Sequence, residues 1–280
     1  MPAPKDLIAP ADARGCVSQH GERPNFDGDL APPGEHDIWR LGETGVHWRH
    51  VTGRNLMQPM FSNRAAAGRL LAEKLAHYSG QPGLIVLALP RGGVPVAAEV
   101  AHALQAPLDV LVVRKLGAPF NPEFALGAVA SGGYRVLNAR ALTTFSVKPA
   151  AIEAVSAREE KELHRREQTY RHGRPALDLH GRLVILIDDG IATGSTMRAA
   201  VAAARDARAG LIVVATPVAA RESFMELRPS VRGFVTLGLP RDFGSVGEYY
   251  EDFAAVSDAE VRHHLDHAWQ ESIAMVSGSA

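Results

Sequence analysis

The spacing of apolar residues divides the chain into parts. Residues 1–58 are rich in Pro, Gly, Asp and His and show no sustained strand or helix period, which predicts a tail or a loosely attached arm. From Ser62 onward, short apolar runs alternate with segments that have helical spacing. The pattern predicts an N-terminal arm over 1–58, a folded core over 59–240 and a C-terminal hood or helix over 241–280.

The core pattern predicts strands and helices in alternation. A first helix is expected to begin at Ser62 or Asn63, since both are good N-cap residues. Strands are expected at 84–89, 108–113, 183–188, 211–216 and 233–238, and further helices at 94–104, 149–172, 195–207 and 220–227. Strands that alternate with helices form parallel sheets. The predicted fold class is therefore α/β, with an open, mostly parallel five-stranded sheet and helices on both faces.

A pair of glycines interrupts this alternation. The segments LGAVAS and YRVLNA flank Gly132 and Gly133, and a two-residue interval between apolar runs is typical of a β-hairpin. We therefore expect a small antiparallel hairpin beside the parallel sheet.

Composition limits the classes of partner. Thirty Lys and Arg stand against 31 Asp and Glu, so no overall field attracts nucleic acid or an anionic membrane. No segment approaches the roughly 18 to 20 apolar residues that a membrane helix needs. Cys16 is the only cysteine, and the N-terminal residues lack the apolar run of a secretory signal. We expect a cytoplasmic protein with no nucleic-acid and no membrane partner.

The segment VILIDDGIATGSTMRAA (184–200) carries the most informative chemistry. An apolar strand ends at Asp188 and Asp189, and a loop of small and hydroxylated residues then opens a helix; its members are Ala192, Thr193, Gly194, Ser195 and Thr196. Ligands of open α/β sheets bind at this edge, and a helix N-terminus offers N–H groups to a phosphate. The carboxylates could accept hydrogen bonds from two vicinal hydroxyls or hold waters on a divalent ion. These features suit a ribose 5-phosphate; the alternative is an acidic strand end before an ordinary capped helix.

This segment resembles the signature of type I phosphoribosyltransferases, which bind 5-phosphoribosyl-1-pyrophosphate (PRPP). In that family the two acids contact the ribose hydroxyls and the loop binds the 5-phosphate. The resemblance implies these roles for Asp188, Asp189 and residues 192–196, with Mg²⁺ as cofactor, held by the two aspartates through water. It also implies PRPP and a small planar base as ligands. Because homodimers are common in the family, we expect one here.

The segment ALPRGGVPVA (88–97) supports the resemblance independently. Gly92 and Gly93 let the backbone approach an anion, and Arg91 supplies a fork of donors. In the family this loop binds pyrophosphate and often contains a cis peptide bond, here expected between Pro90 and Arg91. An ordinary Pro-Gly turn is the alternative.

A third segment, VVRKLGAPFNPEFALGAV (112–129), resembles the family's catalytic loop. Arg114 and Lys115 are expected to end the second strand and precede this loop, where basic residues would neutralise charge on the departing pyrophosphate. We therefore predict Arg114, Lys115 and Asp189 as catalytic residues. The two cations could equally be surface residues.

The resemblance implies a transferase that moves 5-phosphoribosyl from PRPP to a nitrogenous base. Enzymes for 6-oxopurines carry an Asp where this chain has Ala192, which argues against hypoxanthine or guanine as acceptor. In the hood, Tyr249, Tyr250 and Phe253 could stack on a base or pack internally.

One alternative is a non-catalytic regulator that binds PRPP or a nucleotide. A third reading is a hydrolase or phosphotransferase with a metal bound directly to the acidic pair.

Overall fold

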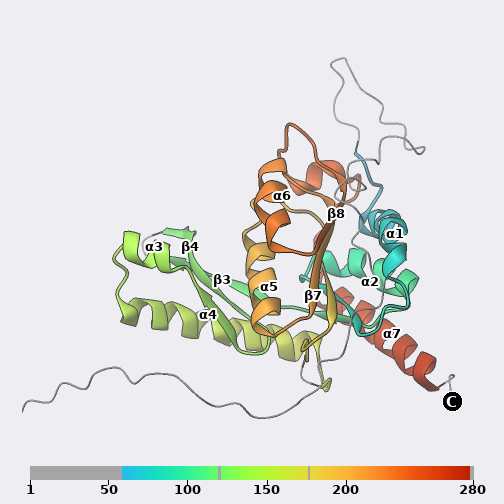
Figure 1. Cartoon of the computed structure of the whole chain (residues 1–280), viewed down its shortest axis with the longest axis horizontal. Helices are drawn as coiled ribbons and strands as arrows, with labels where there is room; N and C mark the ends of the chain where they lie inside the picture. Colours follow the sequence, from blue (N-terminus) through green and yellow to red (C-terminus); the bar gives the residue numbers. More distant parts are fainter. Residues whose placement is uncertain (1–58, 119–120, 176, 278–280) are drawn as a thin grey trace, which may run out of the picture. The chain divides into compact units, whose positions relative to one another are not determined.

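The computed structural model describes residues 59–118, 121–175 and 177–277 (Figure 1). By its internal contacts the chain divides into Met1–Asn55 and Leu56–Ala280, and all described residues belong to the second unit. The arm expected over 1–58 lies outside the described residues. No helix within the described ranges is long and apolar enough to cross a membrane.

Five parallel strands form the main sheet, as the alternating pattern predicted. They are β1 (Leu84–Ala88), β2 (Leu108–Val110), β6 (Leu183–Ile187), β7 (Leu211–Val218) and β8 (Gly233–Gly238), in the order β2-β1-β6-β7-β8. The chain runs outward from β1 to β2 and then returns to the other side of β1 with β6. The strand order therefore reverses between β1 and β6, and such a switch point is where open α/β sheets bind ligands.

Helices cover both faces of this sheet. The helices are α1 (Arg64–Leu75), α2 (Gly93–Leu104), α4 (Pro149–Tyr170), α5 (Ser195–Asp206), α6 (Arg221–Leu227) and α7 (Asp258–Ser277). Val86 and Ala88 pack in the cluster that includes α1, α2 and α7, whereas Ile85 and Leu87 pack in the cluster that includes α5 and α6. Figure 1 shows these two groups on opposite sides of β7 and β8. Side chains on a strand alternate between the two faces of the sheet. A strand that is apolar throughout is therefore covered on both faces.

A second, antiparallel sheet lies beside the first. Its strands are β3 (Val113–Ala118), β4 (Asn121–Ala130) and β5 (Tyr134–Leu137), in the order β3-β4-β5, followed by α3 (Ala139–Thr144). The turn from β4 to β5 contains Gly132 and Gly133 at φ 85° and 78°, so the predicted hairpin is confirmed. Glycine adopts such positive φ values without steric cost.

The expectation that the second parallel strand covers 108–113 and ends at Arg114 and Lys115 was wrong. The second parallel strand ends at Val110, and Arg114 and Lys115 lie inside β3, where they pair with Val129 and Ala128. Residues 108–113 form one continuous apolar run, and apolar residues suit both sheets. The sequence pattern therefore does not show where β2 ends and β3 begins.

A short backbone pairing joins the beginning and end of the described core. Phe61 N–H donates to the Tyr249 carbonyl at 3.0 Å, and Glu251 and Asp252 donate to the carbonyls of Phe61 and Ser62 at 2.9 and 3.0 Å. Asn63 then caps α1, because its side chain accepts a hydrogen bond from Ala66 N–H at 2.9 Å. The start of α1 is thereby fixed against residues 249–252.

Candidate functional site

The candidate site lies at the carboxyl edge of the sheet, where the strand order reverses. Asp188 and Asp189 follow β6 directly, and Arg91 follows the neighbouring strand β1. The two strand ends are in register, since Ala88 pairs with Ile187 and Leu89 N–H donates to the Ile187 carbonyl at 2.8 Å. The pairing of β1 with β6 therefore brings together two segments that are about 100 residues apart in the sequence.

The loop after β1 packs closely against the two aspartates. A Cβ built on Gly92 would lie 2.0 Å from Oδ2 of Asp189, and one on Gly93 would lie 2.7 Å from the Ile187 carbonyl oxygen. Both positions therefore require glycine in this arrangement. The peptide bond between Pro90 and Arg91 is cis, as the resemblance implied.

The two aspartates differ in their surroundings. Burial raises the pKa of Asp188 well above its ordinary value, and the neighbouring charge of Asp189 raises it further. Oδ1 of Asp188 accepts a hydrogen bond from Asp189 N–H at 2.9 Å. The Asp189 side chain instead has a cation beside it, because Arg64 Nε donates to its Oδ2 at 2.8 Å. Asp189 is thus the one of the two whose carboxylate Arg64 binds directly.

The hood supports the backbone of Asp189. The Tyr250 hydroxyl donates to the Asp189 carbonyl oxygen at 2.6 Å, and the buried Tyr250 ring stacks on Phe253 at 5.1 Å between centroids. Burial raises the pKa of this hydroxyl, so it remains a donor. The Tyr249 hydroxyl likewise donates to a backbone carbonyl, that of Asp242, at 3.3 Å. Both tyrosines are therefore packing residues here, one of the two readings that their sequence allowed.

The loop from Ala192 to Thr196 begins α5. Gly194 has φ 69°, which turns the chain into the helix, and Ser223 Oγ on α6 donates to the Ala192 carbonyl at 2.5 Å. The hydroxyls of Thr193 and Ser195 lie 3.2 Å apart, and Thr196 is exposed. First-turn N–H groups of a helix lack partners within the helix. The loop therefore presents hydroxyls and N–H groups at the same edge as the aspartates.

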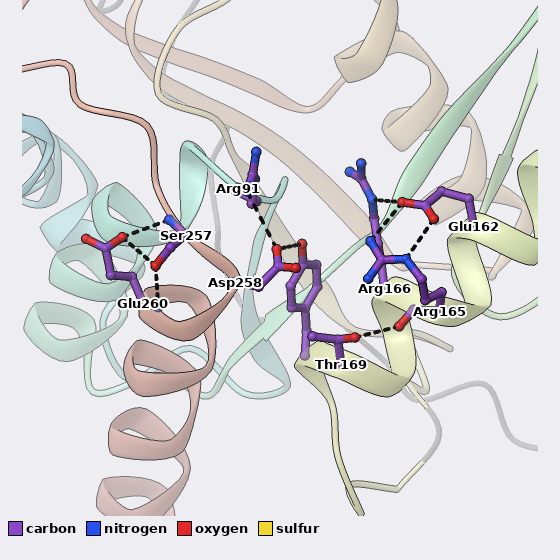
Figure 2. Close-up of polar contacts among 9 residues, drawn as sticks. Arg91, Glu162, Arg165, Arg166, Thr169, Ser257, Asp258 and Glu260 are labelled. Carbon is purple, nitrogen blue, oxygen red and sulfur yellow. Dashed lines mark hydrogen bonds and ion pairs between the residues drawn. The ribbon is translucent and has the colours of Figure 1, made fainter.

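Arg91 extends from the β1 loop toward the start of α7. Figure 2 shows its side chain beside Asp258, and the pair is 3.8 Å apart from Nη1 to Oδ1. The same oxygen of Asp258 accepts a hydrogen bond from the Tyr170 hydroxyl at 2.7 Å. The contact between Arg91 and Asp258 is longer than a hydrogen bond, and the Arg91 side chain is 47% exposed. The guanidinium is therefore available to an incoming anion.

Two arginines of α4 share an acidic partner from the same helix. Glu162 accepts hydrogen bonds from Nε of Arg165 at 2.8 Å and from Nε of Arg166 at 2.9 Å (Figure 2). The bonds from Arg165 and then Arg166 lower the pKa of Glu162 to about 2. Glu162 is thus a carboxylate shared by two cations at ordinary pH.

Arg114 and Lys115, which we predicted near the departing pyrophosphate, occupy different surroundings. Nε and Nη2 of Arg114 donate to one oxygen of the buried Glu159 on α4, at 3.0 and 2.6 Å. Lys115 is exposed, and as the next residue of β3 it points to the other face of the small sheet. The Arg114 side chain is therefore bound to α4, and the catalytic role of both residues stays a prediction.

The carboxylates at the site suit a metal ion that takes most of its ligands from water and substrate. Among the residues that the structure describes, no group of three or more His, Cys, Asp or Glu could hold a metal ion. Mg²⁺ commonly uses one or two carboxylates and completes its shell with water and substrate phosphates. Asp188 and Asp189 match that requirement.

Comparison with known proteins gives results in keeping with this geometry. The family model described as "Phosphoribosyl transferase domain" matches residues 61–238. Two Mycobacterium tuberculosis proteins, from strains H37Rv and CDC 1551 and each provisionally named a phosphoribosyl transferase, are 46% identical over 209 residues, or 75% of this chain. The chain spans about half the length of these curated relatives, 47%. The crystal structure of TT1426 from Thermus thermophilus is 46% identical, with a TM-score of 0.67 over 73% of this chain and 97% of that protein.

Proposed function

Because the chain belongs to the phosphoribosyl transferase domain family, we propose that it transfers 5-phosphoribosyl from PRPP to a small nitrogenous base. The observation that carries this proposal is one continuous segment at the switch point of the sheet. Asp188 and Asp189 end β6, and the loop 192–196 opens α5 immediately afterwards. Acceptors for a diol and donors for a phosphate thus lie within a few residues of each other.

Each part of the site has a role in this proposal. Asp189, with Asp188 beside it, accepts hydrogen bonds from the two ribose hydroxyls, and the loop 192–196 binds the 5-phosphate. Arg91 and the backbone of Gly92 and Gly93 bind the diphosphate. These contacts fix the anomeric carbon at the sheet edge, so that the base nitrogen and the leaving diphosphate lie on opposite sides of it.

The reaction breaks the bond between the anomeric carbon and the diphosphate oxygen and forms a bond from that carbon to the base nitrogen, and a proton carried by that nitrogen leaves to solvent. Positive charge grows on the ribosyl group while negative charge grows on the diphosphate. Arg91 stabilises the negative charge with its guanidinium, and Asp189 holds the ribosyl group in place by its hydroxyls.

We propose Mg²⁺ as the cofactor, held by Asp188 and Asp189 through water. When bound, Mg²⁺ would neutralise part of the diphosphate charge as the leaving group departs. The absence of an acidic side chain at Ala192 supports an acceptor other than hypoxanthine or guanine, because 6-oxopurine enzymes of the resembling family use an Asp there.

The direct test is pyrophosphate release from PRPP with Mg²⁺, measured across purines, pyrimidines and small heterocyclic bases. We expect release that depends on one base and stops when Mg²⁺ is removed with a chelator. If PRPP binds but no base causes release of pyrophosphate, the result would instead support a non-catalytic regulator. If PRPP does not bind at all, both functions are contradicted.

A second prediction concerns the contact between Arg91 and Asp258. The substitution Asp258→Asn removes the charge that competes for Arg91, while Asn can still accept the hydrogen bond from Tyr170. Because exposed ion pairs contribute about 0 to 1 kcal/mol, we expect inorganic pyrophosphate to bind roughly two- to fivefold more tightly. Isothermal titration calorimetry would measure the change.

The matched control is Asp266→Asn, which removes a charge from the same helix but at the contact with Arg174. Equal tightening in both variants would mean that net charge, and not release of Arg91, is responsible.

A further inference from the structure

Arg64, which no sequence motif identified, is the first residue of α1 and reaches the carboxylate pair. Its side chain is only 11% exposed. Nε donates to Asp189 Oδ2 and Nη1 donates to the Ala254 carbonyl, both at 2.8 Å, and the guanidinium carbon lies 3.8 Å from the centre of the Phe253 ring. Arg64 therefore binds the site and the hood at the same time.

A cationic side chain at the N-terminus of α1, such as that of Arg64, is unfavourable for the helix. The N-terminus of a helix has partial positive charge and prefers acidic side chains, yet the first turn of α1 contains none. The local disadvantage is offset by the contact with Asp189, which is itself only 13% exposed. A residue that contradicts local preference in this way indicates a role in the site.

Asp189 is held on three sides in this arrangement. Arg64 binds its Oδ2, Tyr250 binds its carbonyl oxygen, and Gly92 leaves space for the same Oδ2. The position of Oδ2 is therefore constrained, and Oδ1 is the oxygen that Arg64 does not use. Partners of this kind orient a ligand-binding carboxylate without touching the ligand.

We propose that Arg64 is a positioning residue, which orients Asp189 toward the ribose hydroxyls and balances its buried charge. This inference rests on the proposed function, because it assigns Asp189 to the ribose of PRPP. The competing explanation is purely structural: Arg64 would only attach residues 253–254 to α1. The two explanations differ in what happens when Asp189 no longer has a charge.

The experiment is a double-mutant cycle on PRPP affinity, measured with Mg²⁺ on the full chain. We expect Arg64→Gln to weaken PRPP binding by about 10- to 100-fold, the usual effect of removing a partner of a ligating residue. On the Asp189→Asn background the same change should cost less than about twofold, because Arg64 acts through the Asp189 carboxylate. Arg64→Lys should retain part of the affinity, since Lys keeps the charge but not the planar fork of donors.

Kinetics provide a readout that a structural role would not move. Ribose contacts exist in the bound substrate as well as in the transition state, so Arg64→Gln should raise the KM for PRPP with little change in kcat. The control is Arg69→Gln, which removes an arginine of the same helix that pairs with Glu99 on the surface. Arg69→Gln should leave the KM unchanged.

The outcomes separate the inference from the function on which it rests. Equal losses on both backgrounds, or unchanged affinity in the Arg64→Gln variant, would overturn the positioning role. If Arg64→Gln fails to fold, the better tolerated Arg64→Lys decides by the same cycle. If the unchanged chain does not bind PRPP, the proposed function is wrong and the inference falls with it.

Discussion

Replacing Asp188 and Asp189 together by Asn is expected to weaken PRPP binding by roughly 150- to 20,000-fold while the protein stays folded. A hydrogen bond to a charged group contributes about 1.5 to 3 kcal/mol, so the loss of two such bonds costs about 3 to 6 kcal/mol. The fold should tolerate the change, because Asn nearly matches Asp in shape and at 188 can still accept the hydrogen bond from the residue 189 N–H. Asn at 189 also keeps an oxygen that can accept from Arg64.

Calorimetric titration with PRPP and Mg²⁺ would measure the affinity, and circular dichroism would establish that the variant is folded. A suitable control is the pair Glu73→Gln and Asp206→Asn, which removes two exposed carboxylates from α1 and α5. Undiminished affinity in the Asp188 and Asp189 variant would mean that PRPP binds elsewhere.

The substitution Gly92→Ala should have a comparable effect without any change of charge. The added Cβ would lie 2.0 Å from Oδ2 of Asp189, so either the β1 loop or the carboxylate must move. A displacement of about 1 Å at a reacting centre can reduce catalysis 100-fold. We therefore expect a loss of about 100-fold in kcat/KM for PRPP, measured as pyrophosphate release.

The substitution Gly233→Ala serves as the comparison, because the atoms nearest to its Cβ would be the Tyr78 hydroxyl, at 3.2 Å, and the side chain of Val213, at 3.5 Å. Its activity should stay close to that of the unchanged protein. An active Gly92→Ala variant would show that the loop can move away from Asp189 without harm, and so that the close approach is not needed for the reaction.

Local patterns in the sequence were sufficient to predict the main sheet. Strands such as 84–89 and 183–188 are buried on both faces and therefore read as continuous apolar runs, and the structure has β1 and β6 there. The signature around Asp188 was equally local, since the strand, the acids and the loop are consecutive. The structure confirms their place at the sheet edge, while their binding roles stay predictions.

The remaining features depend on contacts between distant residues. Arg64 and Asp189 are 125 positions apart, and nothing near Arg64 in the sequence distinguishes it from the other cations of its helix. The hydroxyl of Tyr250 finds the Asp189 backbone only after the hood has folded over the sheet. The partner of Arg114 could not be predicted either. Glu159 is one of several acidic residues on α4, and only its burial in the folded protein distinguishes it from the others. Sequence periodicity carries no information on such pairings.

The pairing of residues 60–62 with 249–252 affects when the site can first form during synthesis. Arg64 and Asp189 leave the ribosome well before Tyr250 and Ala254, yet the carboxylate is fully held only after all four are present. Contacts so distant in sequence form late, because a long loop must close first. A nascent chain that ends before residue 249 should therefore lack the finished site, and its substrate could stabilise the domain only after the whole core and the first part of the hood have left the ribosome.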